Sequence, residues 1–359
     1  MMGEMSEKKS VAVIFGGRSP EHEISCISAG FIAKGLREIF GRVVNIYIDK
    51  SGNWHRVDDG IIDFTKLDVK NEAESCTIEQ CLTDVDIVWS VLHGPYGEDG
   101  KIQGLFEMYD VPYVGCNVTA SAIAMDKVIA KNVFEHAGLK TVKYELLLEK
   151  EYRDDEEREL ERIEKLGFPM FVKPANMGSS VGISKATDEK KLKKAIEDAF
   201  QYDYRLIIEE NIIGKEVEVA VFGNGPYEAS VAGEIRPRAE FYDVDAKYHS
   251  GGDTAIIIPA DISEEQMKML QEEAKIAARA IDCKGICRVD SFIKADSNEI
   301  FINEVNTMPG FTEISMYPKL WEVSGISNKE LLERIINYGY ETYKGKSSRD
   351  AALRGTRKV

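Results

Sequence analysis

The sequence lacks a surplus of positive charge and the commonest phosphate-binding signatures. It has 46 Lys and Arg against 62 Asp and Glu, for a formal net charge of −16 over 359 residues. A nucleic-acid-binding surface normally needs a basic face, so no nucleic-acid partner is expected. Neither GxxxxGK[ST] nor GxGxxG occurs, so the chain contains neither a Walker A loop nor a dinucleotide-binding fingerprint.

Long apolar runs are also absent. The N-terminal segment MMGEMSEKKS is polar, and the apolar run at 11–15 is far too short to cross a bilayer. We therefore expect no membrane partner and a cytoplasmic location. The six cysteines form no CxxC pair and have no zinc-type partner spacing. Without an export signal they are expected to be reduced, partly buried thiols.

The length and composition indicate a globular protein of several domains. The chain is 43% hydrophobic and 30% charged, and 359 residues are too many for one typical core. Changes in pattern divide it into an N-terminal α/β domain (1–116), a central α+β domain (117–214) and a C-terminal α+β domain (215–345). Residues 346–359 are basic and poor in apolar side chains, which predicts a disordered tail.

Strands of the buried type alternate with helical segments in the first domain. Strands are predicted at 11–15, 43–48 and 86–92, and helices at 23–39 and 104–108. This alternation predicts an open parallel α/β sheet whose loops at the carboxyl ends of the strands can bind ligands. Further along, helices are predicted at 120–137, 149–166, 188–200, 263–281 and 329–343, and strands at 169–173, 182–185 and 205–210.

Two apolar runs, 289–294 and 299–305, are joined by a polar turn and predict a β-hairpin. Asp290 lies on its first strand, and Glu304 and Asn306 are two residues apart on the second, so the last two share a face. Two carboxylates and an amide oxygen suit Mg²⁺, which usually completes its shell with water and phosphate oxygens. The alternative is an ordinary polar hairpin end.

A glycine- and serine-rich loop at 173–182 follows a predicted strand. Its glycines let backbone N–H groups turn inward, Ser179 and Ser180 add hydroxyls, and Lys173 adds a positive charge. Such a loop can close over nucleotide phosphates, although a plain flexible turn is an equal alternative. Lys127 is a candidate second phosphate-binding lysine, or a solvated lysine on a helix.

Two further segments could complete a nucleotide site. Glu209 ends an apolar strand and Glu216 follows soon after, so either carboxylate could accept from ribose hydroxyls. The long loop 236–252 has little periodicity and is typical of a lid. Lys247 could reach phosphate from it, and Tyr248 a neighbouring hydroxyl; the alternative is a mobile surface loop.

Polar loops follow two strands of the predicted N-terminal sheet. Residues 16–23 come after the first strand and 93–100 after the third, so both should open at the same edge of the sheet. Glu21 could anchor an ammonium group there, and His93 could hold a carboxylate. The alternative for His93 is a packed core histidine.

Taken together, these segments resemble the D-alanine–D-alanine ligase family of the ATP-grasp enzymes over roughly residues 10–340. The most specific pieces are IFGGRSPEHEIS, LHGPYGEDGKIQGLFE, AMDK, FVKPANMGSSVGISK, FYDVDAKY, CRVD and NEVNTMPGFTEIS. The resemblance implies an ATP-grasp fold with ATP between the central and C-terminal domains. It also implies two Mg²⁺ ions (with Mn²⁺ able to substitute), two D-alanine molecules as substrates, and a homodimer, as is common among relatives.

The resemblance assigns a role to each candidate residue. The nucleotide would be held by Lys127, Lys173, Ser180, Glu209, Glu216 and Lys247, and the metal ions by Asp290, Glu304 and Asn306. A hydrogen-bonded set of Glu21, Ser179 and Tyr248 would link the lid to the site. The substrates would meet Glu21, His93 and Ser315. Arg288 and the backbone N–H of Gly310 would be oxyanion donors.

The implied reaction joins two D-alanine molecules through an acyl phosphate, for the terminal dipeptide of peptidoglycan precursors. Dipeptide-forming relatives tend to carry an apolar residue after the serine that matches Ser315, and here Met316 stands there. Together with Tyr248, Met316 favours D-alanine as the second substrate. Glu210 and Asn211 replace a lysine and an aromatic residue of many relatives, which leaves the adenine contacts undefined.

The nearest alternative is a D-alanine–D-serine or D-alanine–D-lactate ligase of the vancomycin-resistance type. A non-catalytic nucleotide-binding protein should have lost its metal ligands, whereas all of them are present. A different carboxylate–amine ligase on the same fold is disfavoured by the loops that contain Glu21 and His93, since they match the amino-acid pocket.

Overall fold

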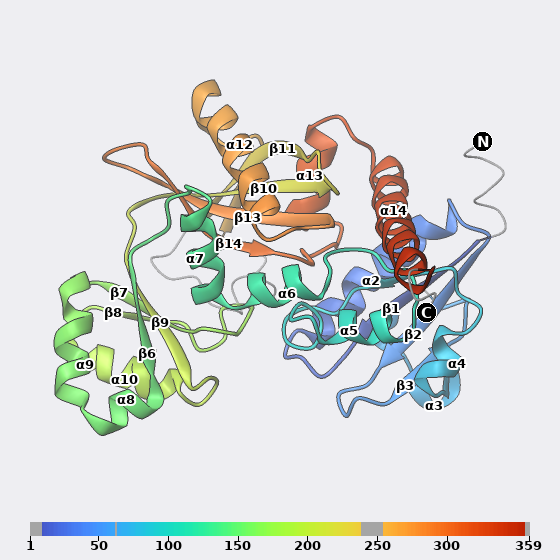
Figure 1. Ribbon diagram of the computed structural model, residues 1–359, viewed down its shortest axis with the longest axis horizontal. Helices are drawn as coiled ribbons and strands as arrows, with labels where there is room; N and C mark the ends of the chain where they lie inside the picture. Colours follow the sequence, from blue (N-terminus) through green and yellow to red (C-terminus); the bar gives the residue numbers. More distant parts are fainter. Residues whose placement is uncertain (1–8, 62, 238–253, 356–359) are drawn as a thin grey trace.

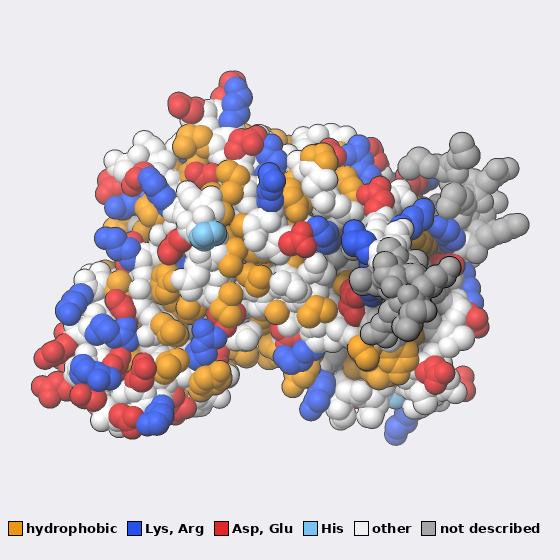
Figure 2. Space-filling view, viewed as in Figure 1, with side chains coloured by type: hydrophobic (Ala, Val, Ile, Leu, Met, Phe, Trp, Pro, Cys, Tyr) orange, Lys and Arg blue, Asp and Glu red, His pale blue; other side chains and the backbone are white. Residues whose placement is uncertain are grey.

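The computed structural model describes residues 9–61, 63–237 and 254–355. Within them the chain forms three β-sheets, with helices packed between and around them (Figure 1). Lys247 and Tyr248, which were predicted to lie on a lid, are outside the described residues. Figure 2 shows charged side chains of both signs interspersed on one face, which is hollowed between a lower-left and a lower-right lobe.

The N-terminal sheet has the strand order β4-β3-β2-β1-β5. Its strands are β1 (Ser10–Gly16), β2 (Arg42–Ile48), β3 (Trp54–Val57), β4 (Ala73–Ser75) and β5 (Ile87–Ser90). Strand β1 pairs in parallel with both β2 and β5, as predicted. The other strands add an antiparallel edge. Every residue of β1 is buried, because helices and loops cover both faces of the sheet.

The helices of this domain are α2 (His22–Arg37), the 3₁₀ turn η1 (Phe64–Lys66), α3 (Val69–Glu72), α4 (Ile78–Leu82) and α5 (Lys101–Met108). Helix α2 begins directly after the loop that follows β1, and its apolar face packs on the sheet. The loop after β5 leads into α5. Both polar loops therefore leave the same edge of the sheet, one after the central parallel strand β1 and the other after its neighbour β5.

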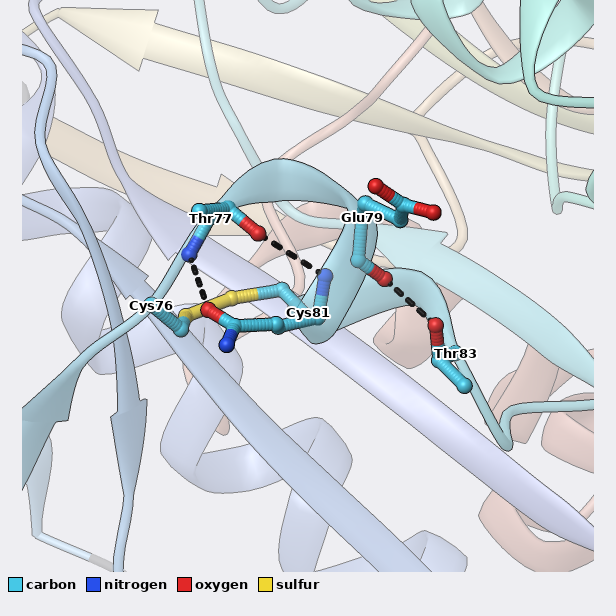
Figure 3. The surroundings of a disulfide bond; sticks show 6 residues. Cys76, Thr77, Glu79, Cys81 and Thr83 are labelled. Carbon is cyan, nitrogen blue, oxygen red and sulfur yellow. Dashed lines mark hydrogen bonds between the residues drawn. A yellow bond between two sulfur atoms is a disulfide. The ribbon is translucent and has the colours of Figure 1, made fainter.

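Two cysteines depart from the prediction of reduced thiols. Cys76 and Cys81 form a disulfide between the end of β4 and helix α4 (Figure 3). Their separation of five residues fits no familiar motif, but α4 turns the chain back at once. A capping box between Thr77 and Gln80 fixes that first turn and brings the two Cα atoms to 6.2 Å. The other four cysteines are free and buried.

The central sheet is antiparallel with the order β6-β9-β7-β8. Its elements are β6 (Tyr144–Leu148), α8 (Glu149–Asp154), α9 (Glu156–Ile163), η2 (Glu164–Leu166), β7 (Met170–Pro174), β8 (Ser184–Ala186), α10 (Glu189–Ala199) and β9 (Arg205–Glu210). The helix predicted at 149–166 is interrupted at Asp155, because that side chain caps a new helix by accepting from the Arg158 N–H. The helices pack on one apolar core of their own.

The C-terminal sheet has the order β12-β11-β10-β13-β14 and is antiparallel. Its strands are β10 (Gly214–Gly223), β11 (Glu228–Pro237), β12 (Thr254–Ile257), β13 (Gly285–Lys294) and β14 (Ile300–Asn306). Strands β13 and β14 confirm the predicted hairpin. Asp290 pairs with Glu304, and Arg288 pairs with Asn306. The predicted ligand positions therefore lie side by side at one end of the hairpin.

Helices α6 (Val118–Met125), α7 (Lys127–His136) and α12 (Glu264–Ala280) bury their apolar faces against this C-terminal sheet. Asp126 separates the first two, where one continuous helix was predicted, since its carboxylate caps α7 by accepting from two backbone N–H groups. The predicted central domain therefore begins with two helices that pack on the C-terminal core. Its own sheet starts only at Tyr144.

The last helices are α13 (Met316–Val323) and α14 (Asn328–Gly355). The prediction of a disordered tail is wrong as far as Gly355, and residues 356–359 lie outside the described ones. The apolar-poor stretch remains helical because it continues a helix that is already docked. Lys346 also forms an ion pair with Glu107 of α5.

Helix α14 lies across α2 in Figure 1, and one apolar core joins the N-terminal and C-terminal domains there. Leu331 and Leu332 of α14 are fully buried, as is Phe311 in the segment after β14. This shared core fixes the distance between the loops of the N-terminal sheet and the hairpin of β13 and β14 that carries the predicted metal ligands (the metal-type hairpin). None of the described helices has the length and apolar character needed to cross a membrane.

A pair of glycine substitutions on α14 tests this docking. A Cβ at Gly339 would lie 2.8 Å from the backbone oxygen of Tyr113 and 2.9 Å from Ile87 Cδ1, whereas one at Gly345 would only touch the end of Arg349 at 3.6 Å. We expect Gly339→Ala to destabilise the protein by about 1–3 kcal/mol, since it overpacks the interface. Gly345→Ala should stabilise it by up to about 1 kcal/mol through helix propensity. Thermal and urea unfolding measure both, and equal effects of the two variants would contradict this packing.

Candidate active site

A cavity of about 370 Å³ lies where the three sheets approach one another. Predicted site residues from all three domains line it: Glu21, His93, Lys127, Lys173, Ser179, Ser180, Glu209, Glu216, Arg288, Asp290, Glu304, Asn306 and Gly310. Its wall thus combines the loops of the N-terminal sheet, the glycine-serine loop and the metal-type hairpin. Ser315 and Met316 are not among the lining residues.

One buried carboxylate in the cavity wall lies between two lysines. Glu209 on β9 is 3% exposed; its Oε2 accepts from Lys173 Nζ at 2.5 Å, and its Oε1 lies 3.0 Å from Lys131 Nζ. Burial would raise the pKa of Glu209, but the two ammonium groups outweigh it and lower the pKa to about 2. Burial opposes the charge on Lys173, yet Glu209 and more distant carboxylates raise the pKa of that lysine.

These contacts change the interpretation of Glu209. The prediction made it an acceptor for ribose hydroxyls, but both of its oxygens face lysines. Glu209 is therefore placed to hold Lys173 in position. Lys173 keeps its charge and lines the cavity, as a phosphate-binding lysine must. Glu216 of β10, the other carboxylate predicted to meet a ribose, also lines the cavity.

Lys127 is the first residue of α7 and points at the glycine-serine loop. Its Nζ donates to the Met177 carbonyl at 2.7 Å and lies 3.6 Å from Glu304 Oε2. The side chain is mostly shielded from solvent, so the alternative of a solvated helix lysine does not hold. Lys127 therefore joins the loop to the carboxylates of the hairpin.

At the end of the hairpin, polar groups form a dense network. The guanidinium of Arg288 donates to both oxygens of Asp290, at 2.7 and 2.6 Å, and lies 3.0 Å from Glu218 Oε2. The Asn306 amide donates to Asp290 Oδ2 at 2.9 Å. Arg288 is 8% exposed, and Asp290 3%. This bidentate pairing holds the Asp290 carboxylate in a fixed orientation.

The oxygens at this end fit a hard divalent cation. No three His, Cys, Asp or Glu side chains converge as a metal-binding group in the described chain. The predicted set has two carboxylates, Asp290 and Glu304, and its third ligand is the amide oxygen of Asn306. Because the Asn306 nitrogen donates to Asp290, the amide oxygen is the atom that would face an ion. A site with only three protein oxygens suits Mg²⁺, because this ion completes its coordination shell with water and phosphate oxygens.

The glycine-serine loop reaches the N-terminal domain. A Cβ at Gly178 would lie 3.3 Å from Glu21 Oε2, and one at Gly94 only 2.3 Å from that oxygen. Gly94 also has a φ of 68°, which favours glycine where the backbone passes the carboxylate. Ser179 and Ser180 have φ of 51° and 59°, a left-handed conformation that non-glycine residues seldom adopt. Such strain is typical of loops shaped for a ligand.

The hydroxyl of Ser179 is shielded from solvent and has no hydrogen-bond partner among the described residues. Its predicted partner Tyr248 lies outside them. Glu21 lines the cavity beside the loop, so two members of the predicted Glu–Ser–Tyr set are near one another. Glu21 stands just before α2, where its carboxylate can receive an ammonium group.

His93 is 3% exposed and both of its ring nitrogens have partners. Nδ1 lies 3.1 Å from the Met308 carbonyl, and Nε2 lies 3.2 Å from Ser28 Oγ. Burial lowers the pKa of His93, so the ring is neutral. In the predicted role, His93 would bind a substrate carboxylate, which would have to displace one of these two contacts.

Glu98, in the same loop, was not among the predicted residues. Its Oε1 accepts from the Gly94 N–H at 2.9 Å, and its Oε2 accepts from the Met308 N–H at 3.1 Å. Burial, helped by the charge of Glu21, raises the pKa of Glu98 to about 8 against the pull of these N–H groups. Glu98 lines the cavity too.

Ser315 and Met316 lie next to the cavity wall. Ser315 Oγ accepts from the Thr312 N–H at 2.9 Å, and it would lie 3.2 Å from a Cβ at Gly310. Met316 is 6% exposed, and its sulfur lies 2.7 Å from the position of a Cβ at Gly233. The Met316 side chain therefore belongs to the core between α13 and β11.

Sequence reasoning missed Ser28, Glu98 and Lys131. Ser28 and Lys131 lie on the buried faces of helices α2 and α7. From the sequence alone, a polar residue in a helix is easily assigned to the solvent-exposed face. The signal for Lys131 is its spacing, since it lies one helical turn after Lys127 and so shares its face. Glu98 sits within the polar loop 93–100 that was already singled out, and only its contacts distinguish it from the neighbouring acids.

Two known protein families match most of the chain. The family described as D-ala D-ala ligase N-terminus matches residues 10–116, and the family described as D-ala D-ala ligase C-terminus matches residues 133–337. A D-alanine–D-alanine ligase of Chloroherpeton thalassium is 48% identical over 94% of this chain and 97% of its own. One of Bacillus cytotoxicus is 43% identical over 94% and 98%.

Solved structures show the same likeness. The D-alanine-D-alanine ligase from Coxiella burnetii matches with a TM-score of 0.86 and 33% identity, over 99% of this chain and all of that one. The VanG D-Ala:D-Ser ligase from Enterococcus faecalis matches with a TM-score of 0.83 and 34% identity, over 93% of this chain and all of that one. The predicted ATP-grasp architecture is thereby confirmed. The chain belongs to the D-alanine–D-alanine ligase family.

Proposed function

We propose that the protein ligates two D-alanine molecules at the expense of ATP, releasing D-alanyl-D-alanine, ADP and phosphate. The observation that carries this proposal is that one cavity holds two kinds of group. Glu21, beside Gly94 and Gly178, is suited to an amino acid, whereas Lys173, Asp290 and Glu304 are suited to a nucleotide. Phosphoryl transfer onto an amino-acid carboxylate requires both in one enclosed space.

The nucleotide half of the cavity neutralises phosphate charge. Lys127 and Lys173 would contact the phosphates, and Ser180 and the loop N–H groups would cover them. Asp290, Glu304 and Asn306 would hold Mg²⁺, for which two ions are expected and Mn²⁺ can substitute. When bound, the metal withdraws negative charge from the transferred phosphoryl group. Glu209 raises the pKa of Lys173 and holds its ammonium group in place for the same purpose.

The reaction follows in two balanced steps. A carboxylate oxygen of the first D-alanine attacks the γ-phosphorus, the bond to the β-γ bridging oxygen breaks, and ADP leaves. The free amine of the second D-alanine then attacks the acyl carbon of the resulting acyl phosphate. A tetrahedral intermediate forms, the amine loses a proton, and collapse expels phosphate and leaves the peptide bond. Positioning and charge neutralisation provide most of the acceleration in such reactions.

Protein groups have distinct tasks in these steps. Glu21 would bind the ammonium group of the first D-alanine and keep its carboxylate towards the phosphates. Arg288 and the Gly310 N–H would stabilise the oxyanion of the tetrahedral intermediate, where one donor is worth about 3 kcal/mol. Arg288 is held for this by its bidentate contact with Asp290. Ser315 would meet the carboxylate of the second D-alanine.

The identity of the second substrate distinguishes the proposed D-alanine–D-alanine ligase from the alternative, a D-alanine–D-serine or D-alanine–D-lactate ligase. The VanG D-Ala:D-Ser ligase shares the fold at 34% identity, whereas the D-alanine–D-alanine ligases of Chloroherpeton thalassium and Bacillus cytotoxicus are 48% and 43% identical. Met316 is directed into the core and does not line the cavity, so it would influence the choice of the second substrate only through the shape of the cavity. D-Serine differs by one hydroxyl, which an apolar pocket discriminates weakly.

We also propose a cytoplasmic enzyme that acts as a homodimer and supplies the terminal dipeptide of peptidoglycan precursors. ATP and free D-amino acids as substrates support the location. The relatives' names support the role in peptidoglycan synthesis, because D-alanyl-D-alanine is the product they describe. Light scattering of the purified protein measures the oligomeric state directly.

Phosphate release with D-alanine, D-serine and D-lactate, each offered beside D-alanine, tests the proposed function. We expect D-alanyl-D-alanine, identified by mass, to be the main product at equal concentrations. Preferential formation of D-alanyl-D-serine or the D-lactate ester would support the alternative. Release of phosphate without any ligated product would overturn both.

Replacement of Glu304 tests the metal site. Glu304→Gln should lower the rate of phosphate release by about 100-fold or more, since a metal's charge stabilisation is worth several kcal/mol. Raising the Mg²⁺ concentration should restore part of the rate, which a purely structural role would not allow. Glu299→Gln, at the far end of the same hairpin, serves as the matched control and should remain fully active.

The pairing of Glu209 with two lysines gives a pH-dependent expectation. The pKa of Glu209 falls from 4.5 to about 2 on folding, so its contribution to stability is present above pH 4.5 and is lost as the pH falls towards 2. Glu209→Gln should therefore lower the unfolding midpoint strongly at pH 7 and much less at pH 3. Its KM for ATP should rise as well, because Lys173 loses its partner. If the Glu209→Gln variant keeps the wild-type unfolding midpoint and the wild-type KM for ATP at pH 7, this account is refuted.

A further inference from the structure

The segment after β14 carries Gly310 into the cavity wall. Residues 307–311 leave the hairpin directly after Asn306 and precede the loop that leads to α13. Thr307, Met308 and Phe311 are almost completely buried. The direction of the Gly310 N–H is therefore set by how the backbone on each side of it is held.

Side chains of the N-terminal domain hold that backbone on both sides. The Met308 N–H donates to Glu98 Oε2 at 3.1 Å, and the Met308 carbonyl lies 3.1 Å from His93 Nδ1. On the other side, the Phe311 N–H donates to Ser28 Oγ at 3.5 Å. These contacts bridge more than 200 residues of sequence.

The contacts form one consistent chain of donors and acceptors. A carbonyl only accepts, so the proton of the neutral His93 ring resides on Nδ1 and is donated to Met308. His93 Nε2 must then accept from the Ser28 hydroxyl, 3.2 Å away. Ser28 oxygen is left to accept from the Phe311 N–H. At the other end, the Gly94 N–H fixes the second oxygen of Glu98.

We infer that Ser28, His93 and Glu98 form a clamp that positions the Gly310 N–H as an oxyanion donor. The clamp spans the two domains, so the donor is correctly placed only when the loops of the N-terminal sheet are docked against the end of β14. In this assignment His93 acts through the backbone of Met308. The inference rests on the proposed function for the role given to Gly310.

The clamp should affect the tetrahedral step more than nucleotide binding. An oxyanion donor must lie 2.7–3.1 Å from the developing charge, and complete loss of one costs about 10²–10³ in kcat. Loosening the clamp shifts the donor without deleting it, so a loss of about 10–100-fold in kcat is expected. The lysines and the hairpin carboxylates that meet ATP are not held by the clamp, so the KM for ATP should stay within about twofold.

Ser28→Ala and Glu98→Gln test the clamp in the full-length protein. Each should lower kcat by about 10–100-fold and weaken binding of a phosphinate analogue of the tetrahedral intermediate by a similar factor. Binding of a non-hydrolysable ATP analogue should not change. The double variant should lose less than the product of the two single losses, because both act on one turn.

Ser121→Ala is the matched control. Ser121 is as fully buried as Ser28, and its hydroxyl has no hydrogen-bond partner in the described part of the chain. The control should keep wild-type kcat. If it loses kcat as Ser28→Ala does, the effect of removing a buried hydroxyl is general and the clamp is rejected.

Hydrogen exchange provides a readout that does not depend on the reaction. The amides of Met308 and Phe311 should exchange faster in the Ser28→Ala and Glu98→Gln variants, while strand β10 keeps its protection. Wild-type exchange in 307–311 together with wild-type kcat would overturn the clamp. Failure of the wild-type protein to ligate D-alanine would instead overturn the proposed function, and the exchange experiment would still decide whether the turn is held.

Discussion

The apolar core shared by the N-terminal and C-terminal domains is the constraint on which the site depends. Helix α14 packs on α2, and Phe311 is buried between the domains, next to the turn that contains Gly310. This packing sets the distance between Glu21 and the metal-type hairpin. These groups can act together because the core holds them around one cavity. The polar contacts of Glu98 and His93 with Met308 then refine a placement that apolar burial has already fixed.

At the cavity, buried charged side chains lie in contact with groups of the opposite charge. Glu209 lies between Lys131 and Lys173, and Arg288 is bidentate on Asp290. A lone buried lysine would tend to lose its proton, which would remove the charge that phosphate needs. In the proposed function, Glu209 would thus serve the nucleotide indirectly, by raising the pKa of Lys173.

Several candidate residues were predicted from the sequence for one function and are placed by the structure for another. Glu209 holds lysines, His93 contacts a backbone carbonyl and a serine, and Met316 packs in the core. His93 and Met316 were singled out because they stand in or directly after distinctive motifs, and Glu209 because it ends an apolar strand. Their partners lie far along the chain, so their roles depend on contacts that spacing does not encode. The helical end of α14 departs from prediction because Lys346 pairs with Glu107 of α5, far along the chain. The Cys76–Cys81 disulfide is local and depends on the turn at the start of α4.

The sequence by itself determined the local elements and the chemical inventory. Alternating apolar runs specify the parallel centre of the N-terminal sheet and the hairpin that holds Asp290, Glu304 and Asn306, because side-chain periodicity and turn residues act over a few positions. The ordered motifs also indicated the family. Only the tertiary structure decided which groups meet: Ser28, Glu98 and Lys131 became visible when distant segments were brought together. Hydrogen bonds and ion pairs act over a few ångströms in space, and sequence distance carries no information about that separation.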